Sequence, residues 1–205
     1  LVALNVAVFA AELSRGAELE ALVYRFGVVP AFWTSEGGGL GRWLQLAPTL
    51  ITSQFLHGGL LHLGSNLLYL WIFGDNVEDR LGPLRFLGLY LASGVVAALA
   101  QLAMQPGSSL PMIGASGAIA GVLGAYLVFF PASKILTLLP WMLAWDFVEV
   151  PAFLFLGFWF LLQWLQGITT IGQVAVGGVA WWAHVGGFVC GMVLGPRLRR
   201  RPKQF

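Results

Sequence analysis

Charged residues divide the chain into long apolar blocks, and the length of a block limits what it can form. A helix needs roughly 20 apolar residues to cross a bilayer, and about 17 to 25 are tolerated. Six blocks are candidates, at residues 1–13, 53–73, 84–104, 114–130, 150–166 and 174–194. The first block is short, so we interpret it as a helix truncated at its N-terminus. The pattern predicts an all-α, polytopic membrane protein with six transmembrane helices, forming one domain over residues 1–205.

The composition argues against a soluble domain. Of the 205 residues, 58% are hydrophobic and 10% are charged, whereas soluble domains carry about 25% charged residues. The 27 glycines suit helices that pack closely within a bilayer. Cys190 is the single cysteine, so an intrachain disulfide is excluded. We interpret Cys190 as a small buried packing residue.

The connection between the first two blocks, residues 14–52, is long, and connections of this length are often functional. It contains Phe32, Trp33 and Trp43 beside three consecutive glycines at 37–39. Because such aromatic side chains favour the membrane interface, we expect an external, membrane-associated loop. A plainly solvated loop is the alternative.

The distribution of lysine and arginine predicts the orientation, because positive charges collect on the cytoplasmic side. The connections at 105–113 and 167–173 contain none. The positive residues lie mainly in the tail and in two other connections: Arg80, Arg85, Lys134, Arg197, Arg199, Arg200, Arg201 and Lys203. We therefore expect a multi-pass protein of a prokaryotic inner membrane with both termini in the cytoplasm. A basic tail beside a span acts as a topological anchor, so we expect no nucleic-acid partner.

The informative residues are polar side chains inside the apolar blocks, because each is costly in lipid unless it is paired or hydrated. His57, His62, Asn66, Ser116 and His184 stand out. A helix rise of about 1.5 Å per residue places His62, Ser116 and His184 about 18, 21 and 15 Å from the cytoplasmic ends of their helices. Asn66 lies one turn below His62. These four side chains therefore share one layer, in a cavity that must be open to the outside.

Small residues indicate which helices meet. They line one side of the fourth and sixth blocks at helical spacing: Gly117, Gly121 and Gly124, and Gly187, Gly191 and Gly195. Small faces let two helix backbones approach closely. We expect the fourth helix to pack on the sixth, with Ser116 beside His184.

This layer has the groups that acyl transfer needs. A serine hydroxyl becomes a nucleophile when a base takes its proton, and His184 is the candidate base for Ser116. No carboxylate lies in the layer, so we predict a Ser–His dyad. Ser116 opens a helix, where free backbone N–H groups favour negative charge.

The oxyanion of the tetrahedral intermediate also needs hydrogen-bond donors. The Asn66 amide and a ring N–H of His62 could join the Ser116 backbone in this role. Gly114 and Gly117 flank Ser116 and would let a substrate backbone come close.

Each assignment has a simpler alternative. Ser116 could be an N-cap, a histidine could be a packing residue, and His62 with Asn66 could clamp two helices. Three histidines could bind a metal, but they lack the spacing and the acidic or thiolate partners of a metal site. We expect no metal and no cofactor.

Together these residues resemble the rhomboid family of intramembrane serine proteases. The resemblance covers nearly the whole chain and rests on three motifs: HGGLLHLGSN at 57–66, GASG at 114–117 and AHVGG at 183–187. Each motif alone is weak, whereas all three in this order within six spans are specific. Residues 75–82 resemble the cytoplasmic turn that follows the second helix in such proteins.

The resemblance implies a six-helix rhomboid-like bundle in which Ser116 is the nucleophile and His184 the general base and acid. It implies that His62, Asn66 and the Ser116 backbone form the oxyanion hole. Gly114 resembles the glycine beside the nucleophile, and Gly187 the glycine that seats the sixth helix on the fourth. The implied substrates are single-span membrane proteins, which would enter past an aromatic-rich fifth helix.

Two positions depart from the family pattern. Some members place a tyrosine one turn after the nucleophile, where it stacks on the histidine, and this chain has Ala120 there. Many members have Trp-Arg in the first loop, where this chain has Arg42-Trp43. The resemblance therefore does not name the residue that orients His184.

The leading hypothesis is a serine endopeptidase acting within the membrane. An inactive rhomboid-like protein that binds client helices is the alternative, although such relatives typically lose the serine or the histidine, and both are present here. A third hypothesis is a small transporter, and this hypothesis predicts paired intramembrane acids or internal repeats. The sequence has neither.

Overall fold

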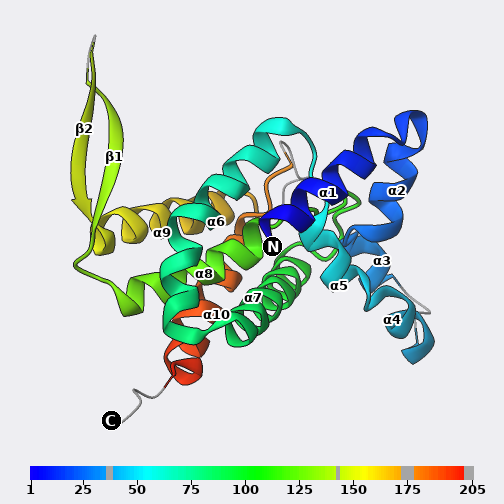
Figure 1. Ribbon diagram of the computed structural model, residues 1–205. Helices are drawn as coiled ribbons and strands as arrows, with labels where there is room; N and C mark the ends of the chain where they lie inside the picture. The colour runs from blue at the N-terminus through cyan, green and yellow to red at the C-terminus, as the bar shows by residue number, and fades with distance from the viewer. Residues whose placement is uncertain (36–38, 142–143, 172–177, 201–205) are drawn as a thin grey trace.

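A computed structural model describes residues 1–35, 39–141, 144–171 and 178–200, and most of these are helical (Figure 1). Along the described chain the elements are α1 (Val2–Leu13), η1 (Gly16–Glu18), α2 (Leu19–Phe26), α3 (Pro30–Thr34), α4 (Leu40–Leu46), α5 (Thr49–Thr52), η2 (Ser53–Phe55), α6 (Leu60–Leu81), α7 (Pro83–Met104), α8 (Ser116–Phe129), β1 (Lys134–Trp141), β2 (Ala144–Pro151), α9 (Ala152–Thr169) and α10 (Trp181–Leu198).

A helix occupies the position of each apolar block, namely α1 and α6 to α10. Of the helices in the described residues, α7 and α9 are long and apolar enough to cross a membrane. Helices α1 and α8 are apolar but shorter. The prediction of a mainly helical chain is therefore confirmed, and six complete spans stay a prediction.

Three predicted boundaries need correction or comment. The second helix begins at Leu60 rather than Ser53, because the chain turns at Gly58 and at Gly59, whose φ of 155° is rarely adopted by residues with a side chain. The same helix continues through the charge-rich segment 75–81, which the resemblance assigns to a turn, and ends at Leu81 with Gly82 as its C-cap. The predicted start of the sixth helix, residues 174–177, lies outside the described residues, and α10 begins at Trp181.

The all-α prediction holds for most of the described chain but did not include one feature, because strands β1 and β2 form an antiparallel hairpin between α8 and α9. It projects away from the helices in Figure 1. Its β-branched residues favour extended backbone, among them Ile135 and Val150, which pair across the strands. At its base the Glu149 carboxylate accepts a 2.6 Å hydrogen bond from Lys134, and this contact raises the pKa of the lysine.

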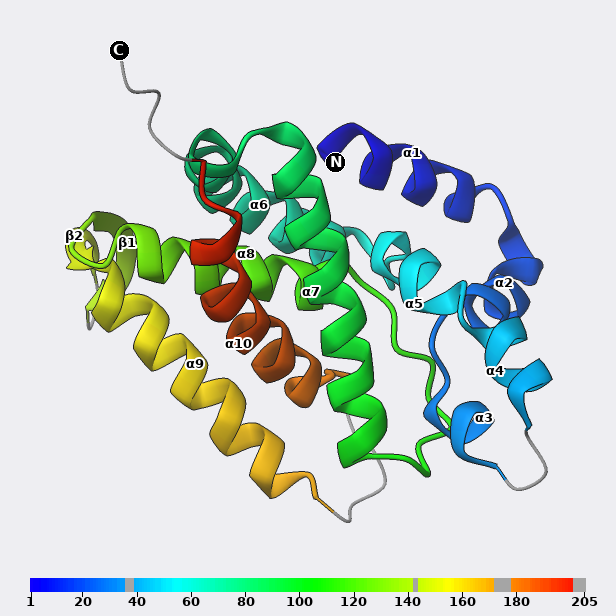
Figure 2. The ribbon, with the colours of Figure 1, turned by 90° about the horizontal axis from the view of Figure 1, so that it is seen from below.

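The connection at 14–52 folds into short helices of its own, α2 to α5, which lie together on one side of the molecule (Figure 2). An antiparallel bridge between Val28 and Met112 joins it to the segment that precedes α8. Trp33 is buried, and its ring meets the ring of Trp43 edge-on, with centroids 5.2 Å apart. Association of this loop with the membrane stays a prediction.

Helix α8 lies at the centre of the fold, in contact with α6, α7, α9 and α10. Residues 117–126 are all buried. Its glycines face those of α10, as predicted: a Cβ added at Gly191 would overlap the carbonyl oxygen of Gly121, and one at Gly187 would overlap that of Gly117. Cys190 on α10 is buried, which confirms its assignment as a packing residue.

Candidate active site

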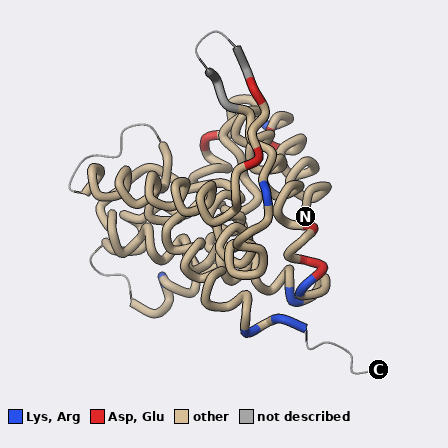
Figure 3. Tube along the Cα trace, turned by 90° about the vertical axis from the view of Figure 1, so that its left-hand side faces the viewer, with Lys and Arg blue, Asp and Glu red and all other residues tan. Residues whose placement is uncertain are grey.

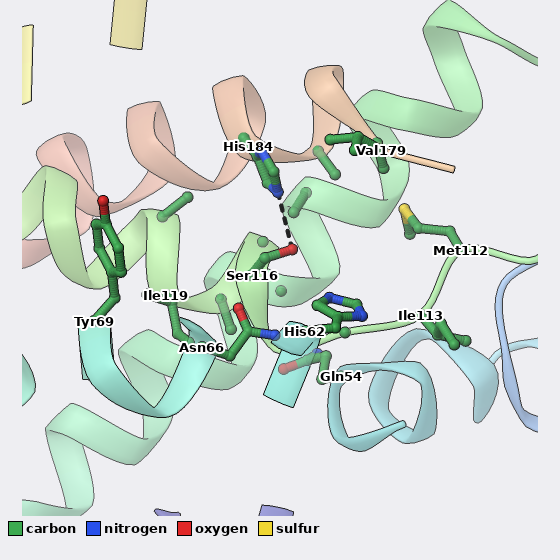
Figure 4. Close-up of a pocket in the computed structure, with 18 of the residues that line it drawn as sticks. Gln54, His62, Asn66, Tyr69, Met112, Ile113, Ser116, Ile119, Val179 and His184 are labelled. Atoms are coloured by element: carbon green, nitrogen blue, oxygen red, sulfur yellow. Dashed lines mark hydrogen bonds between the residues drawn. The ribbon is translucent and has the colours of Figure 1, made fainter. Parts of the chain in front are cut away.

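Ser116 is the first residue of α8, and its hydroxyl points at His184 (Figure 4). Ala115 is the N-cap, and α8 has no side-chain cap hydrogen bond. The alternative that Ser116 caps the helix is therefore wrong. Instead, its Oγ lies 2.9 Å from Nε2 of His184. The structure thus brings together the two side chains predicted to meet.

The segment before α8 fixes the position of Ser116. The backbone N–H of Gly114 donates a 2.9 Å hydrogen bond to the Ser53 carbonyl. Gly114 has a φ of 123°, and a Cβ there would lie 2.7 Å from Nε2 of His62. A side chain at this position would therefore strain the backbone and displace the His62 ring.

The other two supporting glycines act through helix packing. A Cβ at Gly117 would lie 2.6 Å from the Ala97 methyl group on α7, so this glycine lets α8 approach α7. Gly117 also lines the cavity beside Ser116, and the approach of a substrate backbone to it stays a prediction. Gly187 lies against Gly117 and seats α10 on α8.

His184 is held from both sides of its ring. Nδ1 lies 2.7 Å from Oε1 of Gln163 on α9, opposite the contact of Nε2 with Ser116. The ring of Trp159 lies 5.9 Å from the imidazole at an angle of 34°, and Trp181 meets it edge-on at 6.2 Å. The residues around the ring therefore come from α9 and α10 rather than from the position of Ala120.

Sequence reasoning missed Gln163. The signal was present, because Gln163 is an uncharged polar residue inside the fifth apolar block, where each polar side chain needs a partner.

His62 and Asn66 lie on one face of α6 and point toward Ser116 (Figure 4). The Gly58 N–H donates to Nδ1 of His62 over 3.3 Å, so in the neutral ring the proton is on Nε2, the nitrogen near Gly114. Nδ2 of Asn66 is buried and has no hydrogen-bond partner among the described residues. Both side chains thus present a donor beside Ser116.

A cavity of about 410 Å³ connects these residues. His62, Asn66, Ser116 and His184 all line it, together with apolar side chains such as Met112 (Figure 4). None of its lining residues in the described chain is Asp, Glu, Lys or Arg. The site therefore offers a nucleophile, a base and hydrogen-bond donors in a cavity that, within the described chain, has no charged side chain in its lining.

A buried acid that the sequence did not point to supports the turn before α6. The Glu12 carboxylate, 2% exposed, accepts the backbone N–H of His57 with both oxygens at 3.2 Å. The ring of His57 in turn meets that of His62 edge-on, with centroids 5.2 Å apart. Helix α1 is thereby hydrogen-bonded to the loop that precedes α6, the helix that carries His62.

Residues 44–201 match the family model described as Rhomboid domain. The chain is 32% identical to Rhomboid protein 1, mitochondrial, of Saccharomyces cerevisiae over 157 residues, which are 72% of this chain and 40% of that protein. It is 44% identical to Rhomboid protease GluP of Bacillus subtilis over 87 residues, or 42% of this chain and 16% of that protein.

A plant protein, RHOMBOID-like protein 6, mitochondrial, of Arabidopsis thaliana, is 32% identical over 175 residues, which are 83% of this chain and 48% of that protein. In all three comparisons the matched part is less than half of the relative's own length.

Proposed function

The chain belongs to the rhomboid family of membrane proteins, and from this premise we propose that it is a serine endopeptidase that cleaves transmembrane segments of other membrane proteins. The observation that carries the proposal is the 2.9 Å contact between Ser116 Oγ and His184 Nε2. One of the relatives is itself named a rhomboid protease.

The first half of the proposed reaction is acylation of Ser116. Its Oγ attacks the scissile carbonyl carbon while its proton passes to Nε2 of His184. The resulting imidazolium gives that proton to the leaving amine as the C–N bond breaks. Water then attacks the acyl-enzyme, with His184 taking a proton from the water and returning it to Ser116 Oγ.

The oxyanion that forms in both halves is stabilised by three donors. They are the backbone N–H of Ser116 at the start of α8, the Nδ2 of Asn66 and the Nε2–H of His62. Donors held in place before the reaction stabilise the developing charge without having to reorganise at that moment. The buried, unpartnered Nδ2 of Asn66 supports this role.

We propose six spans with both termini in the cytoplasm and single-span membrane proteins as substrates. Ser116, His62 and His184 all lie in the first turns of α8, α6 and α10, which supports a site near one end of the bundle. The relatives named above include mitochondrial and bacterial proteins, so a prokaryotic inner membrane stays a prediction.

The test is cleavage of a single-span substrate by the protein purified in detergent, together with labelling by a fluorophosphonate probe. Ser116→Ala and His184→Ala should abolish both cleavage and labelling. Ser14→Ala, which changes an exposed serine at the end of α1, is the matched control and should keep wild-type activity. Undiminished cleavage by Ser116→Ala would overturn the assignment, and binding of the substrate without cleavage by the wild type would favour the client-binding alternative.

A further inference from the structure

The contact between Gln163 and His184 defines the protonation of the catalytic ring. Oε1 of an amide has lone pairs and no proton, so the ring nitrogen that faces it must be the donor. Nδ1 of His184 therefore carries the proton in the neutral ring, and Nε2 presents its lone pair to Ser116 Oγ. This is the arrangement that a general base needs.

We propose that Gln163 is a positioning residue that holds His184 in the Nδ1–H tautomer and fixes the plane of its ring. The inference rests on the proposed function, which it deepens. Gln163 does not touch the reacting atoms and acts through His184. It takes the place that a carboxylate occupies in a Ser–His–Asp triad.

The surroundings of Gln163 show how strongly its side chain is constrained. Only four residues of α9 are buried, namely Ala152, Leu156, Gln163 and Gly167, and they follow one side of the helix. Gln163 is the polar member of this stripe and is 8% exposed. A buried amide in an apolar helix is costly unless it is hydrogen-bonded, and the bond to His184 meets that requirement.

The other neighbours of the His184 ring cannot select its tautomer. Trp159 and Trp181 contact the imidazole through their ring faces and edges, which limits its tilt but does not select a tautomer. Among the described residues, Gln163 is the hydrogen-bond partner of Nδ1. Removing its oxygen would leave the tautomer to the intrinsic preference of the ring.

The decisive variant is Gln163→Met, which keeps the length of the side chain and removes the acceptor. We expect kcat to fall about 10- to 100-fold with little change in KM, less than the loss from removing the base itself. Gln163→Glu restores an acceptor oxygen and should recover most of the lost kcat. Gln166→Met, an exposed glutamine on the same helix, is the matched control and should behave as wild type.

A spectroscopic measurement separates positioning from a merely structural role. In protein labelled with ¹⁵N-histidine, the His184 signals, identified by comparison with His184→Ala, should show a protonated Nδ1 in the wild type and in Gln166→Met. They should show loss of that preference in Gln163→Met. Thermal unfolding of Gln163→Met close to that of the wild type would confirm that the fold is intact.

The proposal is overturned if Gln163→Met keeps kcat within twofold of the wild type, or if its His184 tautomer is unchanged. It is also overturned if Gln163→Glu is as impaired as Gln163→Met. The tautomer is observed without turnover, so a wild-type protein that fails to cleave its substrate would refute the proposed function while leaving the effect of Gln163 on His184 measurable.

Discussion

Asn66 shows how a single side chain can be prepared for a reaction. Its Nδ2 is buried beside Ser116, and no described residue accepts a hydrogen bond from it. A buried donor without a partner costs roughly 1–3 kcal/mol. A negatively charged oxygen formed on a substrate at Ser116 would accept this hydrogen bond more strongly than the neutral carbonyl does, which is the condition for stabilising a transition state.

We therefore predict that Asn66→Ala lowers kcat about 100- to 1,000-fold, the usual effect of losing one oxyanion donor. KM should change much less, since the donor acts after the substrate has bound. Steady-state kinetics with a single-span substrate would measure both constants. Asn76→Ala, which changes an exposed asparagine on the same helix, should keep wild-type kinetics, and an equal loss in both variants would contradict the role given to Asn66.

At the scale of single residues, the sequence could predict the site residues that are polar side chains, because such side chains are rare within apolar blocks. Ser116 and His184 could be paired because both are polar, both fall at one depth, and both adjoin glycines. Gln163 could not be paired with His184 from the sequence, because the contact depends on how far α9 is rotated about its axis. That rotation follows from packing in three dimensions, which no spacing along the chain specifies.

At the scale of helices, α8 and α10 are in close backbone contact. Carbonyl oxygens of α8 occupy the positions that Cβ atoms on α10 would need. The carbonyl oxygen of Gly121, for example, would overlap a Cβ added at Gly191. Two helices in such contact are joined by close backbone packing rather than by interlocking side chains. Ser116 and His184 belong to these two helices, so their separation is set by this packing.

Gly191→Ala should therefore destabilise the protein, by about 1–3 kcal/mol if the helices can shift to relieve the overlap. Gly157→Ala on α9 is the matched control, because an added Cβ there meets nothing within 4 Å. It should leave stability unchanged or raise it slightly, since alanine favours helix more than glycine. Thermal unfolding in detergent would compare the two, and equal midpoints would argue against a tight α8–α10 contact.

Helix positions could be predicted from block length, since six apolar blocks have six helices at the same places. The hairpin could not be found by that rule, which recognises apolar stretches of about 20 residues. Its alternating and β-branched residues, such as Ile135, Thr137 and Val148, carried the signal of a strand. The start of α6 was misplaced for a similar reason, because hydropathy alone does not register the turn at Gly58 and Gly59.

At the scale of the whole molecule, positive charges meet at one end of the helices. The Arg200 side chain donates to the carbonyl of Leu81, and Arg85 donates to that of Leu198. These bonds join the C-terminal segment to the turn between α6 and α7, and Figure 3 shows the arginines of both segments near one another. Sequence-based charge counting had assigned both segments to the cytoplasm.

Fusions would test this orientation. A fluorescent protein attached after Phe205 should fluoresce, whereas alkaline phosphatase fused after Ser109 should be active, because the segment before α8 has no positive charge and is expected outside. An active phosphatase at the C-terminus would reverse the proposed topology without affecting the assignment of the site.

The amide beside His184 also has an electrical consequence. Among the described residues, the cavity is lined without any formal charge. In the proposed reaction the imidazolium and the oxyanion arise together and disappear together, so the pocket stays electroneutral through the whole cycle. A carboxylate in the place of Gln163 would instead give the empty pocket a net negative charge before any substrate binds. Ionic chemistry can then proceed within a membrane without any lone ion being removed from water.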